Sequence, residues 1–186
     1  YCNNGLQVEG ASEVKKIVTG VSLSQKLIEA AIGENADMIM VHHGFFNDQI
    51  APPVRIDGLV KNRLKLILEN NINIVGFHLP LDAHDKIGNN ISICKILGIK
   101  NTEKCNVGFV GELDSEIDFD KFLALVDSEL ETKSFYINSG NKRVKRVGVI
   151  SGGSSPEFNE AVAMGADTYI AGDIREHIVR AVEETG

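Results

Sequence analysis

The chain has 186 residues, with 19 Lys and Arg against 26 Asp and Glu and a formal net charge of −7. This acidic balance argues against a nucleic-acid surface, because phosphate binding requires clustered basic side chains. With 43% hydrophobic residues the chain can bury the core of one large soluble domain or two small ones. Its apolar runs all fall well short of the ~18 residues that a membrane span needs, so we expect neither a membrane nor a nucleic acid among its partners.

The cysteine content favours a reducing compartment. Cys2, Cys94 and Cys105 are odd in number, widely spaced and form no CxxC motif. This pattern disfavours a disulfide framework and a thiolate zinc site, and we expect a cytoplasmic protein. The chain begins at Tyr1 in a polar segment, and we expect it to be a fragment at this end.

The first elements of the chain are predicted to be a strand, a helix and a strand. Lys16–Val21 is an apolar run of strand length. Ser22, with Gln25 three residues later, matches a capping box for a helix that continues to about Glu34. Asp37–Val41 is a continuous apolar run, as expected of a strand that is covered on both faces.

The same alternation continues after the loop that contains Pro52-Pro53. Leucine and isoleucine residues at helical spacing predict a helix over Asp57–Asn70, and Ile72–Phe77 follows as the next strand. Asn90–Leu97 is predicted to be a helix that Gly98 closes. Strands that alternate with helices indicate an α/β fold with a largely parallel sheet.

The second half of the chain starts the pattern again. Its segments have the lengths and apolar spacing of helices and strands, and a glycine-rich turn precedes its second helix. The predicted elements are a helix over 118–130, strands over 133–137 and 146–150, a helix from Pro156 to about Met164-Gly165, a strand over 168–171 and a helix over 174–184.

The two halves resemble each other. When Val14 is laid on Val144, the sequences align without a gap through Ala36-Asp37 on Ala166-Asp167. We interpret this as an internal duplication. The predicted fold is therefore α/β, with two similar lobes that are each a mostly parallel or mixed sheet flanked by helices. We expect the lobes to span residues 1–105 and 106–186, joined near residues 100–106, with the second lobe truncated at its C-terminus.

Two adjacent histidines end the strand Met38-Ile39-Met40-Val41. Ligands bind at the carboxyl ends of strands in α/β sheets, and His42 and His43 lie at such an end. Neighbouring residues of an extended strand point to opposite sides, so we expect the pair to serve two ions, or one histidine to bind while the other acts as a base. The alternative is a pair of loop histidines that are satisfied by hydrogen bonds.

The next strand end supplies further candidate ligands. Ile72–Phe77 leads directly into His78, and Asp82 follows four residues later. Imidazole and carboxylate groups together suit zinc, iron or manganese, and a carboxylate can bridge two ions. Asp82 alone is equally typical of a turn or an N-cap. Taken with His42 and His43, these residues favour a metal site.

Two features of the second half carry weaker signals. His177 follows the strand that corresponds to the one ending in His42, and it is either a proton-transfer group or a half-buried helix histidine. The turn Gly152-Gly153-Ser154-Ser155 resembles an anion-binding nest, although a serine-capped helix start explains it equally well.

These segments together resemble the GTP cyclohydrolase I type 2 homologues, also called the Nif-three-like family. The resemblance rests on Asn4-Gly5-Leu6-Gln7-Val8, His42-His43-Gly44, His78-Leu79-Pro80-Leu81-Asp82-Ala83, Gly165-Ala166-Asp167 and Gly172-Asp173-Ile174 with His177. It spans the whole chain in the order of the family.

The resemblance implies a toroidal homohexamer with a dinuclear metal centre in each subunit. His42 and His43 would each hold one of two divalent ions, and Asp82 would bridge or share them. His78 would be an additional ligand or would lie beside the site. The family's further ligands, a histidine and a glutamate, would come after Gly186. Cys2 stands where the family usually has an acidic residue.

Two functions remain open from the sequence. The first is a metal-dependent hydrolase that acts on GTP, as the family name implies, or on phosphoesters. The second is a non-enzymatic metal-binding or protein-interaction module in which the ions are structural or regulatory. The catalytic residues, the substrate and the identity of the metal are not specified by these residues.

Overall fold

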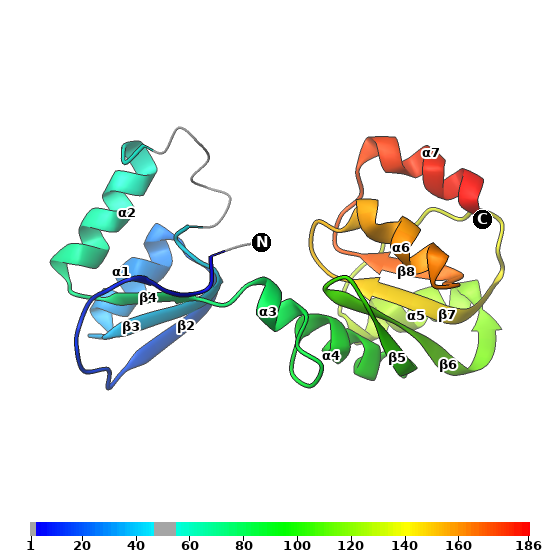
Figure 1. Cartoon of the computed structure of the whole chain (residues 1–186), viewed down its shortest axis with the longest axis horizontal. Coiled ribbons are helices and arrows are strands. Elements are labelled where there is room, and N and C mark those ends of the chain that lie inside the picture. Colours follow the sequence, from blue (N-terminus) through cyan, green and yellow to red (C-terminus); the bar gives the residue numbers. More distant parts are fainter. Residues whose placement is uncertain (1–2, 47–54) are drawn as a thin grey trace. The chain divides into compact units, whose positions relative to one another are not determined.

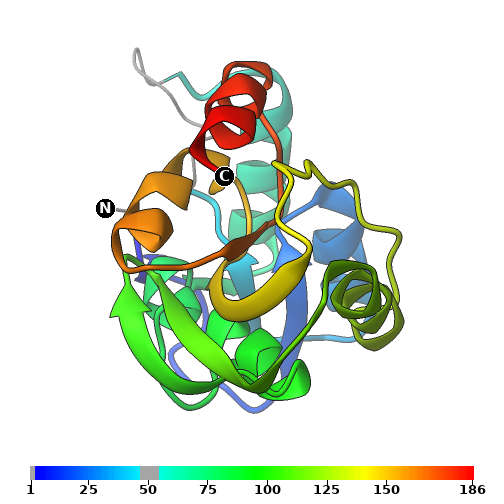
Figure 2. The same ribbon diagram turned by 90° about the vertical axis from the view of Figure 1, so that its right-hand side faces the viewer.

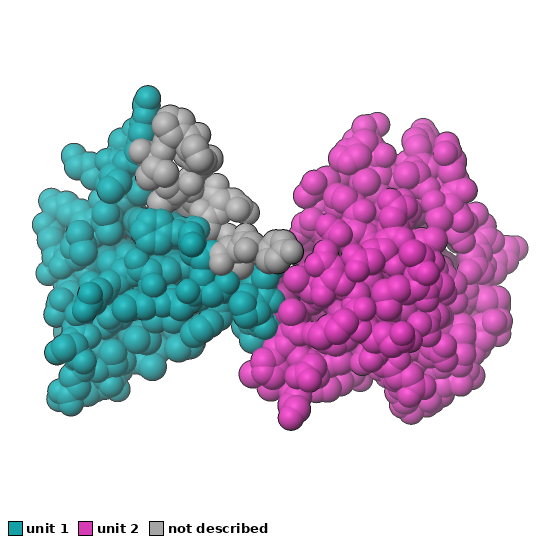
Figure 3. Space-filling view, in the orientation of Figure 1, with its two compact units in different colours: residues 1–81 teal, residues 82–186 magenta. Residues whose placement is uncertain are grey.

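The computed structural model describes residues 3–46 and 55–186, so Cys2 and the Pro52-Pro53 loop lie outside the described residues. The chain divides into two compact units, Tyr1–Leu81 (unit 1) and Asp82–Gly186 (unit 2), which Figure 3 distinguishes by colour. Each unit is built on its own four-stranded sheet (Figure 1). The predicted α/β class with two sheet-and-helix lobes is confirmed.

Unit 1 contains a mixed sheet in the order β1-β4-β3-β2. Strands β2, β3 and β4 are parallel, and β1 runs antiparallel to β4 at one edge. The elements are β1 (Gly5–Val8), β2 (Ile17–Ser22), α1 (Gln25–Gly33), β3 (Met38–His43), α2 (Gly58–Glu69) and β4 (Asn73–Gly76), followed by the short helix α3 (Leu79–Asp82).

Burial of apolar side chains between the sheet and its helices holds unit 1 together. Ile39 on β3 and Ile74 on β4 are fully buried and share one cluster with Ile28 of α1 and Ile67 of α2. Each such side chain contributes roughly 1.5–3 kcal/mol relative to full exposure. Met38 and Met40, which alternate with these positions on β3, are only half-buried. The face of β3 that carries Ile39 and packs against the helices is therefore more deeply buried than the opposite face.

Unit 2 contains a mixed sheet in the order β5-β6-β7-β8, in which only β7 and β8 are parallel. Its elements are α4 (Asn89–Ile96), β5 (Lys100–Cys105), β6 (Gly108–Asp118), α5 (Phe119–Glu129), β7 (Arg143–Ile150), the 3-10 helix η1 (Ser155–Glu157), α6 (Phe158–Ala163), β8 (Thr168–Ala171) and α7 (Glu176–Thr185).

Helices cover both faces of the sheet of unit 2. Val147 and Val149 of β7 belong to the cluster that includes α4 and α5, whereas Ile150 packs with Ala161 of α6 on the other face. Figures 1 and 2 show α6 and α7 together on one side of this sheet. Among the described residues, none of the helices of either unit is long and apolar enough to cross a membrane.

The division between the units falls earlier in the chain than the sequence led us to expect, at residues 81 and 82 instead of 105 and 106. The physical reason is the core of unit 2. Cys94 of α4 and Ile99, just before β5, are buried in one cluster with Phe109 of β6. The expected joint at residues 100–106 is instead strand β5 and the turn into β6, so that joint was wrong.

Two described cysteines lie in the core of unit 2. Cys94 and Cys105 are buried free thiols. Burial raises the pKa of each to about 11, so neither is a thiolate at neutral pH.

The structure corrects two local predictions. Ser24, not Ser22, caps α1, because its hydroxyl accepts the amide N–H of Leu27. Lys133–Ile137 is not a strand. Its apolar residues Phe135 and Tyr136 are 75% and 53% exposed, and the segment is tied to α5, where the Asp127 carboxylate accepts the Ser134 amide, instead of to a neighbouring strand.

The predicted similarity of the two halves is confirmed in the pairing of their strands. β2 pairs with β3 from Ile17↔Met38 onward, and β7 pairs with β8 from Val147↔Thr168 onward. Each residue of the second pair follows its counterpart by the 130 positions of the sequence alignment. One strand–helix–strand frame is therefore present in both units.

An aspartate joins the strands of this frame at the same place in both units. Asp37 Oδ2 accepts the amide N–H groups of Lys15 and Lys16, each at 2.8 Å. Asp167 Oδ2 accepts those of Lys145 and Arg146, each at 2.9 Å. One carboxylate oxygen thus satisfies two backbone donors where the paired strands begin.

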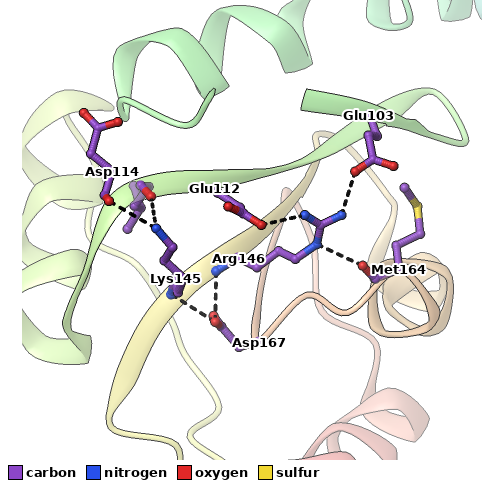
Figure 4. A network of polar contacts seen from close by, with 8 residues as sticks. Glu103, Glu112, Asp114, Lys145, Arg146, Met164 and Asp167 are labelled. Atoms are coloured by element: carbon purple, nitrogen blue, oxygen red, sulfur yellow. Dashed lines mark hydrogen bonds and ion pairs between the residues drawn. The ribbon is translucent and has the colours of Figure 1, made fainter. Parts of the chain in front are cut away.

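Figure 4 shows the further polar contacts that the side chains of Lys145 and Arg146 make in unit 2. The guanidinium of Arg146 donates to Glu112 Oε1 at 3.0 Å, to Glu103 Oε1 at 2.8 Å and to the Met164 carbonyl at 2.9 Å. The contacts reach β5, β6 and the end of α6. Arg146 therefore ties the sheet of unit 2 to the helix that precedes β8.

The charge of Asp37 is expected to stabilise unit 1 in a pH-dependent way. Hydrogen bonds from the Lys15 amide and then the Lys16 amide lower the pKa of Asp37 below its ordinary 3.8. A depressed pKa in the folded state means that the stabilisation is present at neutral pH and is lost as the pH falls below that range. We predict that Asp37→Asn, which keeps an acceptor but no charge, lowers Tm at pH 7 and has less effect near pH 3.

Thermal unfolding between pH 7 and pH 3 measures this difference. Asp85→Asn is the control, since Asp85 is an exposed carboxylate whose neighbour is the His84 ring. A difference between wild type and Asp37→Asn that stays constant across the pH range would contradict the prediction.

Candidate metal centre

The parallel pairing of β3 with β4 brings their carboxyl ends to the same edge of the sheet. Val41 pairs with Gly76, and the Phe77 amide donates to the Val41 carbonyl at 2.9 Å. His42 and His43 are the last residues of β3, and His78 follows β4 by two residues. The predicted strand-end position of the three histidines is therefore confirmed for each of them.

The three imidazole rings form a compact triangle. The ring centroids are 4.7 Å apart for His42 and His43, 4.8 Å for His42 and His78, and 4.9 Å for His43 and His78. One ring nitrogen from each residue lies within 4.8 Å of the other two, and all three side chains are half-buried. Adjacent residues of a strand were expected to point apart, but these two rings converge where the strand ends.

Hydrogen bonds orient His42 and His43 from the two strands beside β3. His42 Nδ1 lies 2.8 Å from the Phe77 carbonyl oxygen, after β4, and His43 Nδ1 lies 2.8 Å from Ser22 Oγ at the end of β2. A carbonyl only accepts, so His42 Nδ1 carries a proton, and Nε2 is the ring nitrogen left to bind a metal. A carboxylate, a backbone carbonyl or water is the usual partner of the second ring nitrogen of a metal-binding histidine, and His42 matches this pattern.

His78 is held differently. Its backbone amide donates to Asn4 Oδ1 at 2.8 Å, while its ring Nδ1 is buried and has no hydrogen-bond partner among the described residues. A buried polar nitrogen without a partner costs roughly 1–3 kcal/mol. A metal ion that takes this lone pair would remove the cost, so the donor set fits the imidazole-binding metals proposed from the sequence.

Asp82 lies at the end of α3 in unit 2 and is 7% exposed. Its Oδ1 accepts the side-chain amide of Asn89 at 2.7 Å, and its carbonyl accepts that of Asn90 at 3.3 Å. Among the residues that the structure describes, the group of clustered metal-ligand atoms consists of the three histidines. The interpretation of Asp82 as a ligand therefore stays a prediction.

The weaker candidates lie in unit 2. His177 is exposed at the second position of α7, and its role in proton transfer stays a prediction. The glycine-rich turn already holds an anion of the chain itself, because Asp173 Oδ1 accepts the Ser155 amide at 2.8 Å. Burial raises the pKa of Asp173, but this amide and the Arg175 guanidinium lower it overall. The nest therefore binds a carboxylate within the fold.

A cavity of about 290 Å³ lies in unit 2 beside α5, β8 and α7, and Ser155 and Asp173 are among its lining residues. Much of its lining is apolar and aromatic, with Phe122, Phe158 and Ile178 among the buried contributors. The described residues that line it include no histidine. All of its lining residues belong to unit 2, whereas the three histidines belong to unit 1.

Sequence reasoning missed the residues that hold the histidines in place. Ser22 was interpreted as a helix cap, and Asn4 contributed only to the family resemblance. Gln7 also belongs to this set, since its Oε1 accepts the Phe45 amide at 2.5 Å just after His43. The sequence shows only that these polar residues lie beside or within strand-length segments. That position does not reveal which backbone or ring atoms their side chains bind.

The chain is similar to known proteins over its whole length. The model of the Duf34/NIF3 (NGG1p interacting factor 3) family matches residues 1–186. The GTP cyclohydrolase 1 type 2 homolog of Haemophilus influenzae is 38% identical over all of this chain and 76% of its own length, and that of Escherichia coli K12 is 37% identical over all of this chain and 75% of its length.

Solved structures share the fold as well. The solved structure of protein ybgI, a protein of unknown function, has a TM-score of 0.90 at 37% identity, and the match covers all of this chain and 75% of the ybgI chain. A Thermus thermophilus protein has a TM-score of 0.85 at 27% identity, with the match covering all of this chain and 74% of its own. The sequence resemblance is thereby confirmed, and the chain belongs to the Duf34/NIF3 family, as a relative of the GTP cyclohydrolase 1 type 2 homologs.

Proposed function

We propose that this chain binds two divalent metal ions at the triangle of His42, His43 and His78. We further propose that it acts as a metal-dependent hydrolase. The observation that carries the proposal is the cluster of three histidines, in which one ring nitrogen of each lies within 4.8 Å of the others. The buried His78 Nδ1, which has no hydrogen-bond partner among the described residues, supports it. Zinc, iron and manganese all accept imidazole ligands.

The proposal of two ions rests on the family resemblance and on how the rings are held. The His42 and His43 rings are held from opposite neighbouring strands, so each could serve a different ion. We keep Asp82, four residues after His78, as the proposed shared carboxylate, because a carboxylate can bridge two ions.

Hydrolysis is the chemistry that such a site supports. A bound divalent ion lowers the pKa of a coordinated water toward ~7 and so supplies a nucleophile at neutral pH. The histidines would hold and orient the ions, and the Phe77 carbonyl and Ser22 would fix two of the rings. We propose GTP or a phosphoester as the substrate because relatives carry the name GTP cyclohydrolase 1 type 2 homolog.

We further propose that the full-length protein acts in the cytoplasm as a toroidal homohexamer. A second candidate function is a non-enzymatic metal-binding interaction module. Two observations favour it: the clustered ligand atoms of the described residues are imidazoles alone, and the family description names an interacting factor. An activity test separates the two functions.

For the hydrolase, we predict that full-length, metal-loaded protein turns over GTP or a member of a phosphoester panel. His43→Ala and Asp82→Ala should lower kcat at least about 100-fold, since each removes a proposed metal ligand. His84→Ala is the control, because its Nδ1 accepts the exposed Lys86 amide. Bound metal without turnover of any of these compounds would leave the binding module as the function.

For Asp82, we predict that Asp82→Asn lowers the number of bound ions from two to one per chain. An asparagine keeps the size of the side chain but is a poorer bridge between cations than a carboxylate. Metal content and protein concentration measured on the same dialysed sample give the ratio. Two ions bound to Asp82→Asn would show that this carboxylate is not the shared ligand.

A further inference from the structure

Two side-chain amides near the start of the chain hold the histidine-bearing segments against each other. We infer that Asn4 and Gln7 are positioning residues of the metal site, an inference that rests on the proposed metal binding. Each acts through the backbone of a different segment. Gln7 holds the chain that leaves His43, and Asn4 holds His78 itself.

Gln7 is directed toward the site by an irregularity in β1. Leu6 pairs with Val75 and Val8 pairs with Ile74, so two steps along β1 correspond to one step along β4, with Gln7 as the extra residue. Such a bulge turns a side chain away from the alternation of the strand. The strand thus places Gln7 where a regular register would not.

The amide of Gln7 binds the backbone just after the histidine pair. Its Oε1 accepts the N–H of Phe45 at 2.5 Å and that of Phe46 at 3.3 Å, and its Nε2 donates to the Asn3 carbonyl at 3.0 Å. These bonds fix the direction in which the chain leaves β3. The backbone that directly follows His43 is therefore anchored to β1.

Two glycines make the room that this amide occupies. A Cβ added at Gly44 would lie 2.2 Å from Gln7 Oε1, and one added at Gly76 would lie 2.7 Å from Gln7 Nε2. Both distances are shorter than real contacts. Gly44 follows His43 directly and Gly76 ends β4, so the amide of Gln7 lies between the ends of the two strands that carry the ligands.

Asn4 fixes the third ligand. Its Oδ1 accepts the backbone amide of His78 at 2.8 Å, across 74 residues of sequence. The same segment contributes Asn3, whose side-chain amide donates to the Phe46 carbonyl at 3.3 Å. Residues 3–7 thus contact both the segment after His43 and the backbone of His78.

This arrangement matters because metal ligands must be placed within about 0.2 Å of their bonding distances. His42 and His43 share one segment, but His78 comes from another, and β3–β4 pairing ends before it at Val41↔Gly76. Beyond that point Asn4 and Gln7 supply bonds from one short strand to both segments. They pre-organise the triangle without contacting the ions.

The test measures metal affinity and coordination of the full-length protein with Zn²⁺ and Co²⁺ alone. Asn4→Ala and Gln7→Ala should weaken Zn²⁺ binding about 10- to 100-fold in competition with a chelator. They should also change the visible absorption of the Co²⁺ form, because ligand geometry sets those bands. Asn4→Asp keeps the acceptor for the His78 amide and should restore wild-type affinity or better.

The matched control is Asn73→Ala, at the opposite end of β4. Asn73 is 5% exposed and makes three side-chain bonds to the backbone, with Gly10, Ala11 and Asp37. Its loss should lower Tm yet leave Zn²⁺ affinity within about threefold. If this variant does not fold, Asn70→Ala replaces it, since Asn70 bonds to the Leu66 carbonyl at the same end.

Three results would overturn the inference. Wild-type affinity and an unchanged Co²⁺ spectrum in Asn4→Ala and Gln7→Ala would show that these residues do not position the ligands. An equal loss of affinity in the control would show that they act only through stability. Absence of Zn²⁺ and Co²⁺ binding in the wild type would instead refute the proposed metal site itself.

Discussion

The parallel pairing of β3 with β4 is the constraint on which the site depends. It brings the ends of two strands to one edge, so that His42 and His43 meet His78, which lies 35 residues further along the chain. Buried isoleucines on both strands hold that register, because a shift by one residue would turn Ile39 and Ile74 out of the core. The hydrophobic core of unit 1 thereby determines where the imidazoles stand.

The second unit shows what is common to the frame and what is particular to the site. Asp37 and Asp167 accept equivalent pairs of backbone amides, and the strands that follow share one register. The strand ends differ. Where unit 1 has His43, unit 2 has Asp173, which the Ser155 amide and Arg175 bind within the fold. The shared frame supplies positions, and the residues at those positions supply the chemistry.

The sequence predicted the α/β class, most helices and the three clustered histidines, because apolar runs and strand ends are local signals. It missed β5 and β6, whose charged and glycine-containing segments lack a continuous apolar run. It also missed Gln7, since a bulge and two glycines from distant segments create its place. The convergence of His42 and His43 depends on partners in β2 and after β4, which periodicity along one strand does not report.

Metal analysis of the protein decides whether the histidine cluster binds ions. Full-length wild type and His42→Ala are each stripped with a chelator, exposed to Zn²⁺, dialysed and assayed for metal per chain. We predict two ions per chain in the wild type and a loss of bound metal in the variant, because His42 is one of the three clustered histidines. A wild type that holds no more metal than His42→Ala would contradict it.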